Sequence, residues 1–477
     1  MSSPPLPLEV RDDRLSLDGT WEVQLEPGSP SLPIVVPFTF EAPLSGIGHG
    51  AEVHERVRYR RSFRVPERWD GVDVLLRFGG VDWHAVVSVD GEEVASHTGG
   101  YTHFSVALGP LDSSVEHELV VDVADPAEGY QPRGKQRGSG GIWYTRATGI
   151  WRPVWLEAVP VVDSAPVTKT LVGGGRPWSP EDPCLAELVT AGVRTYRGER
   201  TVELRDGRFH LNGEPRFLAG VLDQAYWPDG VYTAPSDEAL RRDVELVKEF
   251  GFDLARMHMK VADPRWYDWC DRLGLMVAQD IPSPLDLSTP EAQGNYVREV
   301  DEIVEQLRGH PCIVMWILFN EAWGDPPEEF QRELVHRVRA SDSTRIVVDA
   351  SGWTHRGITD LRDVHDYGDD LSAHRSTAAE PLWIGECGGV SLVIAGTEDF
   401  AYKHVVSGEA LAAEYARLTG TLGDVAGFVW TQLTDVEGEL NGLLTHDRQP
   451  KAPVELIRAA NEQLRRSRSG AGSAPSP

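Results

Sequence analysis

The stretch IVMWILFNE, residues 313–321, has seven apolar residues in a row, followed by Asn320 and Glu321. A short run that is apolar throughout is typical of a strand buried on both faces, as the strands of a parallel sheet are. A second run of this kind, LWIGE at residues 382–386, also ends on a glutamate. In a parallel barrel the carboxyl ends of the strands meet at one mouth. Glu321 and Glu386 are therefore expected to lie together there.

The same pattern extends on both sides of these runs, over residues 208–465. Eight apolar runs are candidate strands: Phe217–Leu222, Leu254–Met259, Leu275–Gln279, Ile313–Phe319, Ile346–Asp349, Val364–Tyr367, Leu382–Gly385 and Ala426–Thr431. Amphipathic stretches between most of them predict helices, with Ser236 and Asp263 as the expected N-caps of two. The fifth and sixth connections are too short for a full helix. The alternation predicts a (β/α)₈ TIM barrel that is irregular at those two connections.

The rest of the chain divides into an N-terminal β-domain and two shorter pieces. Residues 1–160 contain short alternating runs separated by Gly, Asp and Pro, which predicts a β-sandwich of the jelly-roll type with a hairpin turn at Asp90-Gly91. Residues 161–207 keep only a few β-like runs and are too short for a complete sandwich domain. Residues 466–477 are rich in Ser, Gly, Pro and Arg, so we expect a disordered tail. The predicted fold class is a multidomain protein that combines β and α/β domains.

Composition argues against some classes of partner. The chain of 477 residues is 41% hydrophobic and 25% charged, which is ordinary for a soluble protein, and its formal net charge is −28. This charge repels phosphate groups, so neither nucleic acid nor an anionic membrane is an expected partner. The four cysteines lack metal-ligand or disulfide spacing, and no segment has the pattern of a secretory signal or a membrane span. We therefore expect a cytoplasmic protein, and homo-oligomer formation stays open.

Several segments together resemble glycoside hydrolase family 2, the family of β-galactosidases and β-glucuronidases, over nearly the whole chain. The similar segments are LSLDGTW at 15–21, GGYTHF at 99–104, GIWRPVW at 149–155, WSPEDPCLAEL at 178–188 and LNGEPRFLAGV at 211–221, besides Asn320-Glu321 and Gly385-Glu386. The resemblance implies a sugar-binding jelly roll at 1–160, an immunoglobulin-like middle domain reduced to 161–207, and a catalytic TIM barrel at 208–465. The short middle piece leaves two readings open: a reduced domain, or a deletion that ties the jelly roll only loosely to the barrel.

The resemblance also implies that Glu321 is the general acid/base and Glu386 the nucleophile of a retaining glycosidase. Such an enzyme needs its two carboxyl groups about 5–5.5 Å apart, because no water has to fit between the sugar and the second carboxylate. At that distance we expect each charge to raise the pKa of the other group, which would keep Glu321 protonated at neutral pH. Two surface glutamates that merely follow strands are the alternative interpretation.

Further candidates for substrate binding accompany the two glutamates: Asn320, Arg256, His258, Lys260, Tyr367, Trp430 and Asp223. Asn320 is expected to bind the sugar 2-hydroxyl, and Arg256 and Tyr367 to hold Glu386 ionised, although a structural ion pair is an alternative. Trp430 resembles the aromatic platform beneath the sugar, with core packing as the alternative and Trp316 and Trp323 as weaker candidates. A core histidine or a solvated lysine is the alternative for His258 and Lys260, and Asp223 lies at a predicted strand end.

The leading hypothesis is a retaining exo-β-glycosidase that hydrolyses O-glycosidic bonds, with the sugar left open. One alternative is a carbohydrate-binding protein that has lost turnover, and another is a transglycosylase or tailoring enzyme that uses the same site. The expected partner is a small oligosaccharide or glycoside, and the chemistry requires no cofactor. Cys387 stands where the family often has an aromatic residue, which we expect to thin the wall beside Glu386.

Overall fold

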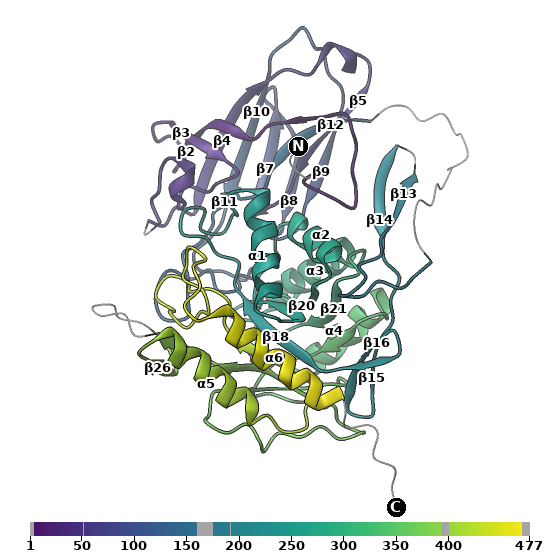
Figure 1. Cartoon of the computed structure of the whole chain (residues 1–477). Helices are drawn as coiled ribbons and strands as arrows, with labels where there is room; N and C mark the ends of the chain where they lie inside the picture. The colour runs from purple at the N-terminus through teal and green to yellow at the C-terminus, as the bar shows by residue number, and fades with distance from the viewer. Residues whose placement is uncertain (1–3, 51, 160–174, 191, 393–399, 470–477) are drawn as a thin grey trace, which may run out of the picture.

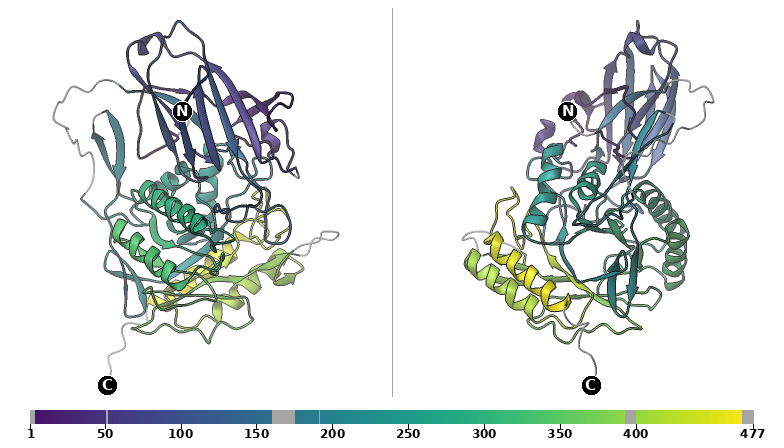
Figure 2. Two further views of the ribbon diagram at one scale, coloured as in Figure 1. Left: turned by 180° about the vertical axis from the view of Figure 1, so that it is seen from behind. Right: turned by 45° about the vertical axis from the view of Figure 1, so that its right-hand side comes forward.

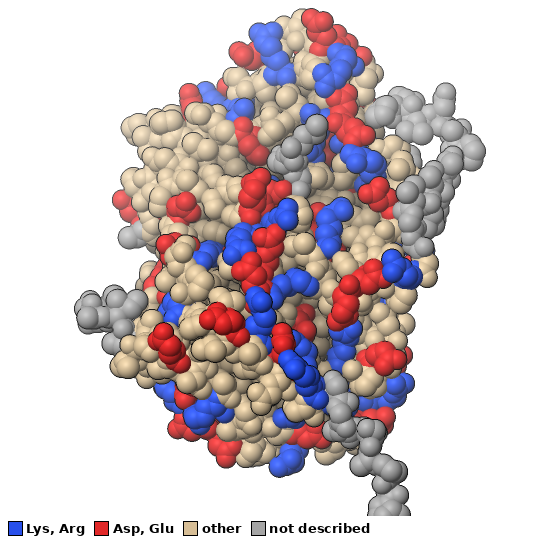
Figure 3. Space-filling model, viewed as in Figure 1, with Lys and Arg blue, Asp and Glu red and all other residues tan. Residues whose placement is uncertain are grey.

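The computed structural model describes residues 4–50, 52–159, 175–190, 192–392 and 400–469. An N-terminal β-domain lies at the top of Figure 1, and a larger α/β domain lies below it. Acidic and basic side chains are interspersed on the face shown in Figure 3, so the net charge of −28 is not gathered into one patch there. Within the described residues, no helix combines the length and apolar character needed to cross a bilayer.

Two antiparallel sheets form the N-terminal β-domain, which confirms the predicted sandwich. The first sheet has the order β1 (Arg14–Ser16), β12 (Val154–Val159), β5 (Asp73–Phe78) and β9 (Phe104–Pro110). The second has the order β3 (Leu32–Val36), β2 (Gly19–Gln24), β4 (Arg56–Phe63), β10 (His117–Ala124), β7 (His84–Val89) and β8 (Glu92–Thr98). Buried and half-exposed residues alternate along β10, so each sheet turns one face to a shared core. Two short strands, β6 (Val81–Asp82) and β11 (Gly149–Ile150), pair beside them, and two 3₁₀ turns cover Pro43–Ser45 and Glu67–Trp69.

The turn between β7 and β8 lies where the sequence predicts it. Asp90 has a φ of 53° and Gly91 a φ of 84°. Two consecutive positive φ angles match the twist of a two-residue hairpin, which is why Asp-Gly is favoured there.

The described part of the middle segment contains the two strands of one hairpin and, at its end, the first strand of a second hairpin. Strands β13 (Ala186–Thr190) and β14 (Val193–Arg197) pair with each other, and residues 160–174 lie outside the described residues. The following strands β15 (Val202–Arg205), β16 (Arg208–Leu211) and β17 (Glu214–Arg216) form a separate three-stranded sheet. The immunoglobulin-like origin of residues 161–207 stays a prediction.

Eight parallel strands form the barrel, one for each predicted run. Their order around the sheet is β22 (Ile346–Val348), β21 (Ile313–Ile317), β20 (Met276–Asp280), β19 (Leu254–Met257), β18 (Leu218–Asp223), β27 (Gly427–Thr431), β24 (Leu382–Gly388) and β23 (Arg362–Asp366). Most of these strands are buried along their whole length, as strands with layers on both faces must be. The ladder stays open between β22 and β23, so the barrel is nearly closed. A small parallel pair, β25 (Val390–Leu392) and β26 (Lys403–Val405), follows β24.

Helices cover the outside of the barrel, as the right-hand view in Figure 2 shows. They are α1 (Asp237–Glu249), α2 (Pro264–Leu273), α3 (Pro290–Leu307), α4 (Glu328–Ser341), α5 (Gly408–Gly420) and α6 (Val454–Ser469). Ser236 Oγ accepts a hydrogen bond from Ala239 N at 3.2 Å, and the Asp263 carboxylate accepts one from Arg265 N at 3.0 Å. Both residues are the N-caps that the sequence predicts. The β22–β23 and β23–β24 connections contain no helix, which confirms the predicted irregularity.

Helix α6 corrects the expected start of the disordered tail. It continues to Ser469, past residue 466. Arg465 Nη1 donates to the Asp253 carboxylate at 2.8 Å, and Arg468 Nη2 donates to Leu422 O at 2.7 Å. These contacts hold the end of the helix against the barrel, which the Ser, Gly, Pro and Arg content of the segment does not indicate. Residues 470–477 lie outside the described residues.

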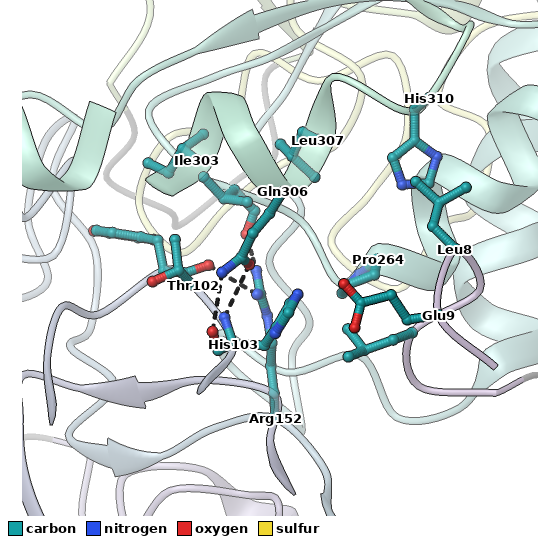
Figure 4. Close-up of a pocket in the computed structure, with 13 residues that line it drawn as sticks. Leu8, Glu9, Thr102, His103, Arg152, Pro264, Ile303, Gln306, Leu307 and His310 are labelled. Atoms are coloured by element: carbon teal, nitrogen blue, oxygen red, sulfur yellow. Dashed lines mark hydrogen bonds between the residues drawn. The ribbon is translucent and has the colours of Figure 1, made fainter. Parts of the chain in front are cut away.

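The N-terminal domain is tied to the barrel by hydrogen bonds, which disfavours loose attachment. Arg152 Nη2 donates to Val261 O at 2.7 Å and to Ala262 O at 2.8 Å. His103 and Gln306 of α3 form a reciprocal pair, His103 N to Gln306 Oε1 at 3.0 Å and Gln306 Nε2 to His103 O at 2.9 Å, beside a cavity of about 30 Å³ (Figure 4). The domain therefore has a defined position over the barrel, from which it can contribute side chains to the mouth.

Candidate active site

Glu321 and Glu386 meet at the carboxyl ends of the barrel strands. Glu321 follows β21, and Glu386 lies near the end of β24. A carboxylate oxygen of Glu321 lies within 4.8 Å of a carboxylate oxygen of Glu386. Glu386 is buried, with 7% of its surface exposed, whereas Glu321 is half-buried. Glu321 has a φ of 51°, an uncommon backbone conformation for a non-glycine residue that often marks functional sites.

Two hydrogen bonds from predicted residues hold the carboxylate of Glu386. Arg256 Nη1 donates to Oε1 at 3.1 Å, and the Tyr367 hydroxyl donates to Oε2 at 2.5 Å. Arg256 is itself fixed by Asp280, which accepts from Nε at 2.9 Å and from Nη2 at 3.0 Å. This bidentate pair is fully buried, so the guanidinium has one orientation. Glu386 is thereby oriented and stabilised as an anion.

His365 lies between the two glutamates, and the sequence interpretation missed it. Its Nδ1 is 2.7 Å from Glu321 Oε1 and 3.5 Å from Glu386 Oε2. His365 lies on β23, two residues before Tyr367, which follows the strand; residues two apart in an extended chain share a face, so this spacing could have revealed it. A Cβ on Gly352 would lie 2.9 Å from His365 Nδ1 and 3.1 Å from Glu321 Cγ. Glycine at this position therefore makes room for the contact.

The charges of this cluster correct the expectation that Glu321 is held protonated. Burial raises the pKa of Glu321, but the hydrogen bond and charge of His365 lower it, and the net shift is downward. The pKa of Glu386 is also lowered, because His365 and Arg256 outweigh burial and the repulsion from Glu321. The pKa of His365 is raised despite its burial, since Glu386 and Glu321 favour the imidazolium. The proton of the Glu321–His365 pair therefore resides on the imidazole in the free protein.

Replacing His365 with asparagine tests this arrangement. Without the imidazolium, Glu386 loses the largest charge that lowers its pKa, so its pKa rises. The acidic limb of the pH profile of kcat/KM, which reports ionisation of the nucleophile, should move upward by about one pH unit. The matched control is His374→Asn, which removes a histidine paired with Asp366 at 2.6 Å outside the cluster. An unchanged acidic limb in the His365 variant would contradict the assigned role.

Asn320 and His258 also lie at the mouth, each with one polar atom held by the protein. Asn320 Oδ1 accepts from Arg256 Nη2 at 3.0 Å and from Ser351 Oγ at 2.9 Å, so its amide NH₂ is directed elsewhere. His258 Nδ1 lies 2.7 Å from Asp280 Oδ2. Burial and the charge of Lys135 lower the pKa of His258 well below its usual value, so the ring is neutral and its Nε2 can accept a hydrogen bond.

Trp430 does not face the two glutamates, which corrects its assignment as a sugar platform. It is fully buried, and its ring packs on Tyr415 of α5 with centroids 4.6 Å apart. The next residue, Thr431, points the opposite way, since its Oγ1 is 3.3 Å from the Tyr367 hydroxyl. Cys387 is likewise buried between strands, with its Sγ 3.5 Å from Val429 O, so it does not thin the wall of the site.

Asp223 and Lys260 are also turned away from the glutamates. Asp223 is fully buried and accepts from Ala225 N at 2.8 Å. Burial and the charge of Asp243 raise its pKa to about 6. Lys260 Nζ donates to Ala225 O and to Tyr232 O, at 2.5 and 2.7 Å. Both side chains therefore brace the loop after β18, and their role in substrate binding stays a prediction.

The cluster also contains side chains that could bind a divalent cation. Glu321, His365 and Glu386 each offer a ligand atom, and these atoms lie within 4.8 Å of one another. One histidine and two carboxylates suit zinc or a similar ion. The same atoms, however, already contact each other, Arg256 and Tyr367, which is the pattern of an acid–base cluster.

Comparison with known proteins agrees with this geometry. The model of the TIM-barrel domain of glycosyl hydrolases family 2 matches residues 202–368. The barrel of this chain is therefore similar to the TIM-barrel domain of that family. The match spans β15 to β23 and includes Arg256, Asn320 and Glu321.

Proteins named as β-galactosidase or β-glucuronidase share moderate identity with the chain. A β-galactosidase from Thermoanaerobacter pseudethanolicus is 27% identical over 384 residues, which cover 65% of this chain and 50% of that protein. A putative β-glucuronidase from Formosa agariphila is 25% identical over 323 residues, 53% of this chain and 38% of the other. The chain thus spans about half the length, or less, of the curated relatives it matches.

Solved structures of family 2 proteins share the fold. A β-glucuronidase from an uncultured Clostridium species superimposes with a TM-score of 0.77 at 20% identity, over 95% of this chain and 99% of that one. A β-galacturonidase from Eisenbergiella tayi, bound to galacturonate, gives a TM-score of 0.75 at 18% identity, over 97% and 99% of the two chains. At such identities the likeness concerns the fold alone.

Proposed function

We propose that this chain is a retaining exo-β-glycosidase that hydrolyses O-glycosidic bonds through a covalent glycosyl-enzyme intermediate. The observation that carries the proposal is the approach of Glu321 and Glu386 to within 4.8 Å, measured between their nearest oxygens. This separation agrees with the roughly 5–5.5 Å of retaining enzymes and leaves no space for the water that an inverting enzyme needs. The β-galactosidase and β-glucuronidase names of the relatives support the reaction class.

In the first step, Glu386 attacks the anomeric carbon and Glu321 protonates the departing oxygen. Arg256 and Tyr367 keep Glu386 ionised and aimed. The proton comes from the Glu321–His365 pair, because a hydrogen bond of 2.7 Å joins Nδ1 to the carboxylate that delivers it. The amide NH₂ of Asn320 would bind the sugar 2-hydroxyl, a contact that strengthens as charge develops on the ring.

In the second step, Glu321 removes a proton from water, which attacks the glycosyl-enzyme. Once Glu386 is esterified, its negative charge is gone. His365 then faces a single carboxylate, and Glu321 can act as the base. A hydroxyl compound in place of water would give transglycosylation from the same intermediate. The substrate is a small glycoside in either case, and homo-oligomer formation and a cytoplasmic location stay predictions.

A panel of p-nitrophenyl β-glycosides, including galactoside, glucuronide and galacturonide, tests the proposal. We expect release of p-nitrophenol from at least one of them, at a rate proportional to the concentration of protein. The control is the protein with both Glu321 and Glu386 changed to glutamine, which should be inactive. If the wild type binds these glycosides without cleaving any of them, the chain is a carbohydrate-binding protein and the proposal is wrong.

A further inference from the structure

A tryptophan from the N-terminal domain reaches the barrel mouth beside Glu321. Trp143 lies in the connection between β10 and β11, and its ring packs against Trp323 with centroids 4.9 Å apart and a tilt of 38°. Trp323 follows Glu321 by two residues, and its Nε1 donates to Glu321 Oε2 at 3.3 Å. The guanidinium of Arg137 covers the Trp143 ring at 5.4 Å from its centroid. The two indoles therefore form a wall that begins at the carboxylate of Glu321.

A third tryptophan stands on the barrel next to the same carboxylate. Trp353 follows β22, and its ring meets His365 edge-on with centroids 5.6 Å apart. His365 is in turn 2.7 Å from Glu321 through its Nδ1, so the Trp353 ring lies one residue away from that carboxylate. Trp353 is nonetheless 63% exposed. Among the described residues, it is the one tryptophan in the group of exposed large hydrophobic side chains. An exposed tryptophan fixed at a reaction centre is typical of a binding surface.

The position of these rings relative to the two glutamates decides which part of a substrate they meet. The group that protonates the departing oxygen must touch the bond that breaks, so side chains held on Glu321 surround the leaving group. Polar groups cluster instead around Glu386, where Arg256, Tyr367 and Asn320 would read the sugar. The tryptophans thus lie on the leaving-group side.

The chemistry of the rings points to an aromatic leaving group. The one hydrogen-bond donor of an indole is its N–H, and Trp323 directs its N–H at Glu321. The ring faces that remain have no hydrogen-bonding group for sugar hydroxyls; they stack on flat apolar surfaces, of which an aromatic ring offers two and a sugar only its C–H side. We propose that Trp143, Trp323 and Trp353 form a subsite for planar aromatic leaving groups, which makes aryl and arylalkyl β-glycosides the substrate class. This inference rests on the proposed glycosidase function.

The test compares three β-glycosides of the sugar that the enzyme accepts best: benzyl, ethyl and a disaccharide. Benzyl and ethyl alcohol are leaving groups of similar acidity, so a difference between their glycosides reports binding of the ring. For Trp143→Ala we expect kcat/KM to fall about tenfold with the benzyl glycoside and less than about twofold with the ethyl glycoside. Trp143→Phe should restore most of the loss. The matched control is Tyr130→Ala, which removes an exposed aromatic side chain of the same domain.

A binding measurement separates this proposal from the proposed function. Calorimetric titration of the wild type with p-nitrophenol should show weak binding, and Trp143→Ala should weaken it about tenfold. That result supports the aromatic subsite even if no glycoside is hydrolysed. Equal loss with all three glycosides, or a loss confined to the disaccharide, would overturn the proposal. So would p-nitrophenol binding that does not change in Trp143→Ala.

Discussion

Changing Glu386 to alanine should lower kcat/KM for aryl glycosides by at least about 10⁴-fold, and sodium azide should restore turnover. The variant lacks the oxygen that attacks the anomeric carbon, so no glycosyl-enzyme forms. It also leaves a space into which the small azide anion can enter. Azide then attacks from the face that Glu386 occupied, and the product is the glycosyl azide of inverted configuration. Nuclear magnetic resonance identifies this product.

Folding must be monitored in this variant, because the change leaves Arg256 and His365 without their shared anion. Glu386→Gln keeps the shape of the side chain and should be equally inactive, although azide cannot rescue it. Glu380→Ala is the matched control, since Glu380 precedes the same strand and lies at the surface. Near-normal activity in folded Glu386→Ala would remove Glu386 from the role of nucleophile.

The second large effect is expected for Glu321→Ala, and its size should depend on the leaving group. Substrates with alkyl leaving groups need the proton, so their kcat/KM should fall by about 10²–10⁴-fold. Dinitrophenyl glycosides need little assistance, and their kcat/KM should stay close to that of the wild type. Deglycosylation lacks its base with both classes of substrate. For the dinitrophenyl glycoside this step becomes rate-limiting, so kcat and KM should fall together while the covalent intermediate accumulates.

Mass spectrometry of the intact variant after rapid quenching shows the added mass of one sugar if this account holds. The wild-type protein, in which Glu321 activates water, should show no accumulation of the covalent intermediate. A uniform loss with all leaving groups, without any covalent species, would show that Glu321 does not act as the acid/base.

The barrel and its two glutamates could be predicted because strong, local patterns encode them. Apolar runs identify strands buried on both faces, and the chain order of such strands places their carboxyl ends together. Arg256 and Tyr367 follow from the same reasoning, since each occupies an inward position near the end of its strand. Their hydrogen bonds to Glu386 need only the fold and the alternation of side chains.

The failures arise where the position of a side chain depends on details of the sheet. Register shifts interrupt the pairing of β24 with both neighbours, between Val364 and His365 on one side and between Ile384 and Cys387 on the other. An irregularity of one residue reverses the face on which later side chains lie, and a sequence does not reveal it. Trp430 and Cys387 lie beside these shifts, and both proved to be core residues.

Two other features depend on contacts between distant parts of the chain. Trp143 reaches the site from another domain, 180 residues before Trp323 by number (323 − 143 = 180), and no local pattern connects the two. The effect of His365 on both pKa values depends on distances that only the folded chain defines. The spacing of His365 and Tyr367 could have placed the imidazole at the mouth, but not its distances to the two carboxylates.

The stereochemistry of hydrolysis tests the central claim most directly, because the separation of the two carboxylates determines it. Wild-type protein is mixed with its best p-nitrophenyl β-glycoside in deuterated buffer, and proton resonance spectra are recorded before the released sugar equilibrates between anomers. Two displacements at one carbon leave the configuration unchanged, so the β-anomer should appear first and the α-anomer only later. The α-anomer as the first product would mean a single displacement by water, which contradicts a site where Glu321 and Glu386 lie within 4.8 Å of each other.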